Sequence, residues 1–341
     1  MPTSQSKSRP KILQIETGYN TQPTKRDSFD IEVIDYKIYE NVPYLWRKIE
    51  TLLRLDIYLA LKAKAKAKDY DIIWAGSEKV GIPLSFLRLK QPLVVIAHHL
   101  ESRLKSAFLN LFQIPGRWAG VGYSSFASKA FFINELGVPE TLTFQCYAAN
   151  YLKQVNDLPP PSPTGKILCA GVAKRDYKTL LSALTKLDGF QTQIFVSSRF
   201  GDTLKNSLPT EVPNWVDFPG YVTDEELLQC YKECRFVVIP LEHTQQGGAG
   251  STAFLEAASC GKAVIATETV GMKTLIEQGV NGLLVPPNDP QAMQDAIQSL
   301  WEQPKLAEKM GKASRKLIES QYNPATVSTN INKFLERFLH K

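Results

Sequence analysis

Short apolar runs alternate along the chain with longer segments in which apolar residues recur every three or four positions. In the first half, short runs predict strands at 11–16, 71–76 and 92–99. The second and third are nearly apolar throughout, as strands covered on both faces of a parallel sheet are. Residues 45–61 predict one helix, because only Asp56 interrupts the apolar spacing, and residues 123–137 predict another that Gly137 ends.

The second half repeats this alternation of strands and helices. Strands are predicted at 166–171, 193–198, 235–240 and 263–267, and helices at 176–187, 223–234, 251–260 and 327–341. Thr223 followed by Glu226 has the spacing of a capping box, which marks the start of one helix. The class is therefore α/β, with two doubly wound parallel sheets, each a Rossmann-like domain, facing a central cleft.

A proline-rich stretch separates the two halves and predicts a stiff linker. We place an N-terminal domain at 1–158, the linker at 159–165, a C-terminal domain at 166–320 and a closing helix within 321–341. Ligands of such sheets bind beyond the carboxyl ends of the strands. The loops that follow the predicted strands are therefore the places to search for a site.

Composition and charge narrow the partners and the location. Of 341 residues, 43% are hydrophobic and 22% charged, as in an ordinary soluble protein, and the net charge is +6. This charge suits phosphate-bearing ligands or an anionic membrane and is too small to indicate nucleic acid, which we do not expect as a partner. Without a run of about 18 apolar residues or a signal peptide, we expect a cytoplasmic protein, at the inner face of a membrane if it binds one.

The most distinctive loop is rich in glycine and lies between the strand 235–240 and the helix 251–260. The N-terminus of a helix carries free N–H groups and a partial positive charge, and glycines let an anion approach the backbone. A phosphate site is therefore expected at Gln246, Gly247, Gly248, Ala249, Gly250, Ser251 and Thr252. Ser251 and Thr252 are expected to cap the helix and add hydroxyl donors. The alternative is a glycine turn that only connects strand to helix.

Two further features bear on the ligand of this loop. Glu256, about one and a half turns into the helix, has two acceptor oxygens that suit a ribose diol, although it could equally be a solvated glutamate. Gly248, Gly250 and Ala253, with Glu268 downstream, also fit the outline of a dinucleotide-binding fingerprint. We consider a dinucleotide site the weaker hypothesis, because the fingerprint needs its first glycine directly at the end of the strand.

Residues 235–297 resemble the C-terminal domain of GT-B glycosyltransferases, in particular the large retaining group called family 4. The resemblance lies in "FLEAASCGKAVIAT" and "LIEQGVNGLLVPPNDPQAM" and weakens toward residue 166. It implies that Glu256 binds ribose, that Arg175 with its neighbour Lys174 holds the diphosphate, and that the N-terminal domain brings the acceptor. His98, with His99 as the fallback, resembles a histidine that contacts the sugar or acceptor.

The chain departs from the family pattern at several positions. Gly248 stands where the family has its first motif glutamate, and Val172 stands where it has an arginine. Gln245, Gln246 or His243, or the backbone of the loop, would then contact the sugar. Thr274 replaces a usual glutamate, which we interpret as structural. The missing carboxylate weakens the implication of a retaining reaction and leaves a weak or inactive relative as an alternative.

The resemblance implies a hexosyl transfer from a nucleotide-diphosphate sugar to a hydroxyl acceptor of a glycan, a polysaccharide or a lipid, without a cofactor. Asp69 and Asp71 match Asp-x-Asp but precede a strand, so no required metal is expected. Alternatives are a non-catalytic subunit that binds a nucleotide sugar, a nucleotide-sugar epimerase, and a nicotinamide-dependent oxidoreductase. Basic, partly amphipathic segments at 45–68 and 98–120 predict either contact with an anionic membrane or ordinary helices with a solvated basic face.

Overall fold

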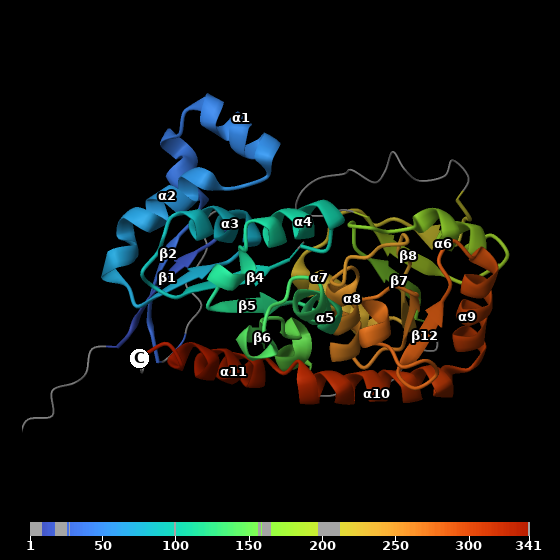
Figure 1. Cartoon of the computed structure of the whole chain (residues 1–341). Coiled ribbons are helices and arrows are strands. Elements are labelled where there is room, and N and C mark those ends of the chain that lie inside the picture. The colour runs from blue at the N-terminus through green and yellow to red at the C-terminus, as the bar shows by residue number, and fades with distance from the viewer. Residues whose placement is uncertain are drawn as a thin grey trace, which may run out of the picture. The chain divides into compact units, whose positions relative to one another are not determined.

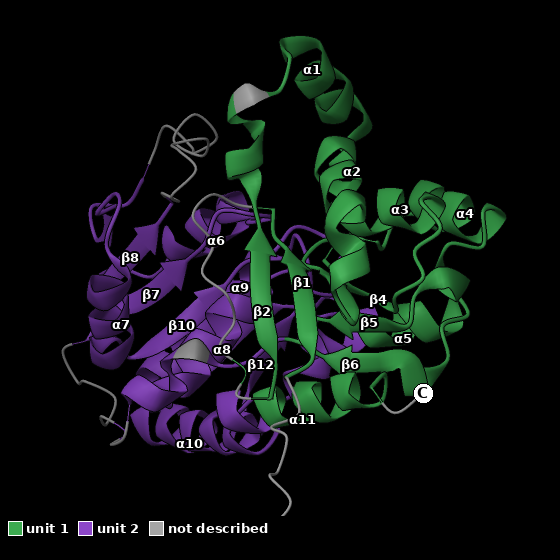
Figure 2. Ribbon diagram, turned by 90° about the vertical axis from the view of Figure 1, so that its left-hand side faces the viewer, with its two compact units in different colours: residues 1–124, 129–146, 327–341 green, residues 125–128, 147–326 purple. Residues whose placement is uncertain are grey.

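The structure, a computed structural model, describes residues 9–17, 26, 28–98, 100–155, 158, 165–196 and 212–339. His99 and nearly all of the predicted linker at 159–165 lie outside these residues. The chain forms two compact units (Figures 1 and 2). Unit 1 contains residues 1–124, 129–146 and 327–341, and unit 2 contains residues 125–128 and 147–326.

Unit 1 is built on a parallel sheet with the strand order β2-β1-β3-β4-β5-β6. The strands are β1 (Lys11–Ile15), β2 (Asp30–Ile34), β3 (Ile72–Ala75), β4 (Leu93–Ala97), β5 (Gly120–Tyr123) and β6 (Thr143–Gln145). Every residue of β3 and β4 is buried, which explains their unbroken apolar sequences. Asp71 accepts the N–H of Lys11 at 2.7 Å just before β3, so this aspartate has the structural place expected of it.

The helices of this half are α1 (Tyr44–Leu53), α2 (Ile57–Lys66), α3 (Glu78–Phe86), α4 (Arg103–Leu111) and α5 (Phe126–Asn134). The prediction of one helix over 45–61 was wrong. Arg54 adopts a left-handed conformation with a φ of 54°, which ends α1, and Asp56 stands at the start of α2. Tyr36 donates to the Asp56 carboxylate at 3.1 Å, so the residue that interrupted the apolar spacing lies in the connection between α1 and α2.

Unit 2 also contains a parallel sheet, with the strand order β12-β11-β10-β7-β8-β9. Its strands are β7 (Ile167–Ala170), β8 (Thr192–Phe195), β9 (Val216–Asp217), β10 (Phe236–Ile239), β11 (Val264–Thr267) and β12 (Gly282–Val285). Helices α6 (Tyr177–Leu184), α7 (Asp224–Glu233), α8 (Ser251–Ser259), α9 (Pro290–Glu302) and α10 (Pro304–Gln321) flank it, and α11 (Pro324–Glu336) follows. The predicted α/β class with two parallel sheets is confirmed.

Short 3-10 helices connect these elements. They are η1 (Tyr36–Asn41), η2 (Ala67–Asp69), η3 (Pro115–Arg117), η4 (Glu140–Leu142), η5 (Asn150–Gln154) and η7 (Met272–Thr274). At the start of α7 the predicted capping box is confirmed. The hydroxyl of Thr223 accepts the N–H of Glu226, and the Glu226 carboxylate accepts the N–H of Thr223 at 2.8 Å.

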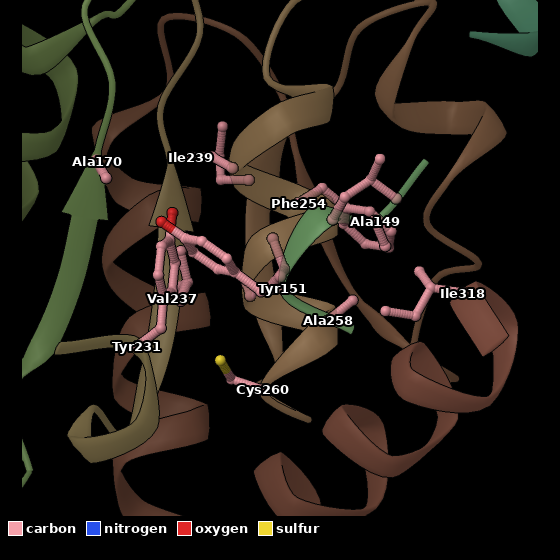
Figure 3. Close-up of a cluster of buried hydrophobic side chains, with 14 of the residues drawn as sticks. Ala149, Tyr151, Ala170, Tyr231, Val237, Ile239, Phe254, Ala258, Cys260 and Ile318 are labelled. Atoms are coloured by element: carbon pink, nitrogen blue, oxygen red, sulfur yellow. The ribbon is translucent and has the colours of Figure 1, made fainter. Parts of the chain in front are cut away.

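The core of unit 2 lies on both faces of its sheet. Alternate residues of β10 belong to different clusters: Val237 and Ile239 face one, Phe236 and Val238 the other. The first cluster, drawn in part in Figure 3, brings Tyr231 of α7 beside the strand and includes most of α8. Because α8 is packed along its length in this cluster, the loop that precedes it is held at a fixed position at the edge of the sheet.

Candidate functional site

The glycine-rich loop begins where β10 ends, at the same edge of the sheet as the ends of β7 and β11. Leu241 forms an isolated bridge with Arg175 of the loop after β7. Its N–H also donates to the hydroxyl of Thr267, the last residue of β11, at 2.8 Å. Three neighbouring strand ends are thus tied together, at the edge where parallel sheets bind their ligands.

Helix α8 begins at Ser251 as predicted, but its cap differs from the prediction. Gly250, with a φ of 80°, is the capping residue, and no side chain caps the helix. The expected capping by Ser251 and Thr252 was therefore wrong. The hydroxyl of Thr252 instead contacts that of Tyr147, and the hydroxyl of Ser251 is buried without a hydrogen-bond partner in the described part of the chain.

Backbone N–H groups gather at this helix start. The N–H of Ser251 donates to the carbonyl of Gly248 at 3.2 Å. Within the described residues, the N–H groups of Gly247, Gly248 and Thr252 meet no acceptor. Free N–H groups, the partial charge of a nine-residue helix and the unpartnered Ser251 hydroxyl together make a site for an anion.

Close packing, rather than an unusual backbone angle, requires glycine at position 247. A Cβ added there would lie 2.9 Å from Ser125 Oγ, Ala127 Cβ and the backbone nitrogen of Ser128. On the other side, a Cβ at Gly271 would lie 2.2 Å from the carbonyl oxygen of Gly247. The loop therefore has a single narrow path between these neighbours.

Glu256 lies about one and a half turns into α8, and the hydroxyl of Tyr231 donates to its Oε2 at 2.9 Å. Burial raises the pKa of Glu256 to about 7, although the Tyr231 hydrogen bond lowers it; Asp224 raises it and Arg175 lowers it. Burial also raises the pKa of Tyr231 well above its ordinary value, so this phenol stays a donor. The carboxyl group is half-buried and keeps acceptor positions for a ligand.

Arg175 bends back over the carboxyl end of β7. Its Nη2 and Nε donate to the carbonyl of Ala170 at 3.0 and 3.3 Å, and Nη1 donates to that of Ala173 at 2.9 Å. Gly171, with a φ of 121°, leaves room for the guanidinium, since a Cβ there would lie 2.3 Å from Nη2. The charge is thus fixed at the strand end, close enough to act on Glu256.

Lys174 and Gln246 flank the same region. Lys174 has a left-handed φ of 57°, and its ammonium lies 3.6 Å from the carboxylate of Glu242 in an exposed pair. Gln246 is half-buried, and its N–H donates to the hydroxyl of Thr244 at 3.1 Å. Unit 2 therefore brings Glu256, Arg175, Lys174 and the glycine-rich loop to one edge of its sheet.

His98 lies in unit 1, directly after β4. Its N–H donates to the carboxylate of Glu78 at 3.1 Å, and its Nε2 lies 3.1 Å from the carbonyl of Gly76. Glu16 follows β1, and burial raises its pKa, while a hydrogen bond from Gln14 and the nearby His98 side chain lower it. A Cβ at Gly76 would lie 2.4 Å from the Glu16 carboxylate, so a side chain there would displace that carboxylate.

Three residues of these surroundings were missed from the sequence: Tyr231, Tyr147 and Glu16. Tyr231 looks like one more apolar position of a helix, and nothing near Tyr147 or in its spacing indicates a contact with Thr252. Glu16 carried a usable signal, because it is the first polar residue after a buried strand. Among the described residues, no three His, Cys, Asp or Glu side chains converge as metal ligands.

Comparison with known proteins agrees with this architecture. Residues 168–317 match the family described as Glycosyl transferases group 1. Over 108 residues the chain is 32% identical to the O-antigen chain mannosyltransferase C of Escherichia coli, covering 31% of this chain and 29% of that protein. The matches to this and two further curated relatives span 29% to 40% of the relatives' lengths.

Solved structures are similar over nearly the whole chain. The Anabaena protein HepE in complex with UDP and glucose has a TM-score of 0.70 at 19% identity, covering 96% of this chain and all of that one. The sucrose-phosphate synthase of Thermosynechococcus elongatus has a TM-score of 0.74 at 17% identity, covering 97% and 99%. The chain therefore has the GT-B fold, and its residues 168–317 match the Glycosyl transferases group 1 family.

Proposed function

We propose that this chain, a GT-B protein with a group 1 glycosyl transferase domain, transfers a hexosyl group from a nucleotide-diphosphate sugar to a hydroxyl acceptor. The acceptor is a glycan, a polysaccharide or a lipid-linked molecule, and the transfer takes place in the cytoplasm as a step of polysaccharide assembly. One observation carries the proposal: a half-buried carboxyl group, Glu256, lies on the helix whose N-terminus offers free N–H groups. This combination suits a ribose diol and a diphosphate on one ligand.

Each group has a task in this proposal. Glu256, oriented by Tyr231, accepts hydrogen bonds from the ribose hydroxyls. The N–H groups of Gly247, Gly248 and Thr252 and the hydroxyl of Ser251 hold the diphosphate. These donors are stronger toward an anion than in water because they are fixed in place and partly buried. His98 serves the acceptor or the transferred sugar.

The leaving nucleoside diphosphate gains negative charge as the bond to the sugar breaks. Arg175 is fixed at the strand end, and Lys174 is exposed and needs only to leave Glu242 to reach a phosphate. Two such cations support departure without a metal ion. The resemblance to family 4 supports retention of configuration at the sugar, whereas Gly248 in place of the first motif glutamate leaves the sugar contacts to Gln246 and the backbone of the loop.

A thermal-shift panel followed by a transfer assay tests the proposal. UDP is tested first, because a protein of similar fold has been solved in complex with UDP and glucose. The other ligands are GDP, ADP, TDP, the sugar conjugates of these nucleotides, and NAD(H). We expect one nucleotide and its sugar conjugate to raise the melting temperature, and Glu256→Ala to abolish the shift. Release of the nucleoside diphosphate in the presence of a hydroxyl acceptor then shows transfer.

Other outcomes would redirect the assignment. Nucleotide binding without release or transfer would indicate a non-catalytic subunit, which the missing carboxylate at Gly248 favours. A new nucleotide sugar formed without an acceptor would indicate an epimerase. Stabilisation by NAD(H) alone would indicate an oxidoreductase, and a Glu256→Ala variant that binds normally would remove the residue from the site.

A further inference from the structure

Helix α1 of unit 1 is oriented with its apolar face toward solvent. Leu45 and Leu52 are 69% and 84% exposed, and Ile49, Leu53 and Trp46 on the same face are exposed as well. Figure 2 shows α1 projecting from the rest of unit 1. An amphipathic helix normally covers a core with such a face, so its exposure calls for a physical explanation.

The polar side of α1 is what holds the helix to unit 1. Glu50 is buried, and its Oε1 accepts the hydroxyl of Tyr39 at 3.1 Å and the N–H of Tyr58 at 2.6 Å. Arg47 donates to the carbonyl of Tyr39. These contacts fix the helix by its charged face, so the outward direction of Leu45 and Leu52 is built into the structure.

Helix α4 repeats the arrangement. Leu104 and Leu111 are 87% and 77% exposed, while Leu109 on the opposite face is fully buried and anchors the helix. Phe112, directly after α4, extends the outward face and contacts Phe86, with ring centroids 5.8 Å apart. Of the sixteen large apolar side chains exposed in the described part of the chain, twelve lie within 44–117.

The positive charge of the protein lies in the same segment. Residues 44–117 contain thirteen Lys and Arg against six Asp and Glu, a net charge of +7, whereas the whole chain has +6. The remainder of the chain is therefore close to neutral. Two of the six acids, Glu50 and Glu78, are buried, so they contribute little to the surface.

From this coincidence we propose that α1 and α4 form a docking surface for an anionic lipid bilayer. The apolar side chains enter the boundary between headgroups and acyl chains, and the flanking Lys and Arg meet the acidic headgroups. Tyr44 and Trp46 are the side chains that prefer this boundary. A second copy of the chain is a poorer occupant, because two surfaces of charge +7 would repel each other.

Vesicle flotation of the full-length protein tests the surface. We expect binding to phosphatidylcholine vesicles that contain phosphatidylglycerol and little binding to phosphatidylcholine alone. Binding should also weaken in concentrated salt, because the Debye length falls to about 3 Å at 1 M ionic strength. Equal binding to both kinds of vesicle, or no binding to either, would overturn the proposal.

Substitutions of exposed residues locate the contact without disturbing a core. Leu45→Ser with Leu52→Ser, and separately Leu104→Ser with Leu111→Ser, should each lower the partition coefficient about tenfold. Tyr221→Ser and Val280→Ser, which change exposed apolar residues of unit 2, should leave it unchanged. A loss in the controls equal to that in the helix variants, or a loss in none, would reject the docking surface.

Two further measurements test the role of positive charge and the insertion of side chains into the bilayer. Lys48→Glu should weaken binding to anionic vesicles, whereas Lys316→Glu on α10, which is also exposed, should not. Trp46 is the exposed tryptophan among the five of the chain, so its emission should shift to shorter wavelength on binding, and Trp46→Phe should remove the shift. Self-association that Leu52→Ser abolishes, without vesicle binding, would assign the surface to a second copy and overturn the proposal.

Discussion

The carboxyl group of Glu256 lies where burial and its neighbours act on its ionisation in opposite directions. Burial raises its pKa to about 7, while the Tyr231 hydroxyl and the Arg175 guanidinium favour the charged form. A group with such a pKa changes charge near neutral pH. Both ligand binding and stability should therefore depend on pH in this range.

The first prediction concerns nucleotide-sugar affinity. A ribose diol donates two hydrogen bonds and prefers the ionised carboxylate, so affinity should rise about tenfold per pH unit below pH 7 and level off above it. Titration calorimetry at several pH values measures this affinity, and a nucleotide sugar is the suitable ligand because its diphosphate does not change charge near pH 7. Glu256→Gln should bind weakly with no such pH dependence, and an unchanged profile in that variant would exclude Glu256 as the titrating group.

Stability should change with pH in the opposite sense. The folded pKa of about 7 lies above the ordinary value of 4.5, so the contribution of Glu256 is fully present below about pH 4.5 and is lost as pH rises through 7. Glu256→Gln, which cannot ionise, should therefore melt at a higher temperature than the unmodified protein above pH 7. Melting curves from pH 5 to 8 show whether the two proteins diverge in this direction.

Tyr231 is a positioning residue in this site, and its hydroxyl can be removed alone. Tyr231→Phe keeps the buried ring but removes the donor to Glu256, so the pKa of that carboxyl should rise further. The affinity profile should then move to higher pH, with a loss of roughly three- to tenfold at pH 7. A purely structural tyrosine would lower affinity equally at all pH values, and that outcome would contradict the role.

Some residues of the candidate site could be predicted from the sequence, and others could not. Glu256 and Arg175 were identified because a resemblance placed them, and the structure brings them to one sheet edge. Tyr231 was missed because its hydroxyl reaches Glu256 across 25 residues, and such a contact depends on how α7 packs on α8. Gly250, not Ser251, caps α8, with a left-handed φ of 80° that glycine adopts without strain.

Among the elements, the path of the glycine-rich loop depends on Gly271. Its φ of −69° is ordinary, so a side chain there is excluded by the carbonyl of Gly247 rather than by backbone strain. Gly271→Ala should displace the loop, lower nucleotide affinity about tenfold and reduce the melting temperature by several degrees.

A matched glycine provides the control for this change. Gly116 has open space around its Cβ position, so Gly116→Ala should alter neither quantity. Calorimetry and thermal melts of the two variants measure the contrast. Normal affinity in Gly271→Ala would show that the loop tolerates displacement and that its narrow path is unrelated to binding.

Helix and strand positions were more predictable than helix ends. Buried strands such as β4 and β10 are apolar throughout because helices cover both faces of the sheet, and this pattern is visible in the sequence. The break between α1 and α2 was not, since apolar spacing continues in phase across Arg54. Hydrogen bonds of Glu50 with Tyr39 and of Asp56 with Tyr36 hold the chain on either side of this break, and the apolar spacing does not indicate such contacts.

For the whole molecule, the end of the chain belongs to unit 1. Residues 327–341 return to it, and Phe334 of α11 packs on Phe144 of β6 with ring centroids 4.6 Å apart. Gly120 of β5 makes room for this ring, since a Cβ there would lie 2.4 Å from it. The sequence predicted a closing helix but contained no signal for where it packs, because that depends on the distant strands β5 and β6.

This packing predicts which strands would lose stability if a cavity were made in α11. Phe334→Ala should cost about 3–5 kcal/mol of stability, because the ring is buried and its neighbours cannot collapse into the space. Hydrogen exchange should then lose protection in β5 and β6 of unit 1 but not in β7 and β10 of unit 2. Lys333→Ala, on the exposed side of the same helix, is the control and should change neither. An equal loss in β7 and β10 would mean that α11 stabilises both units together, and an unchanged β5 would mean that this helix contributes little to the sheet it covers.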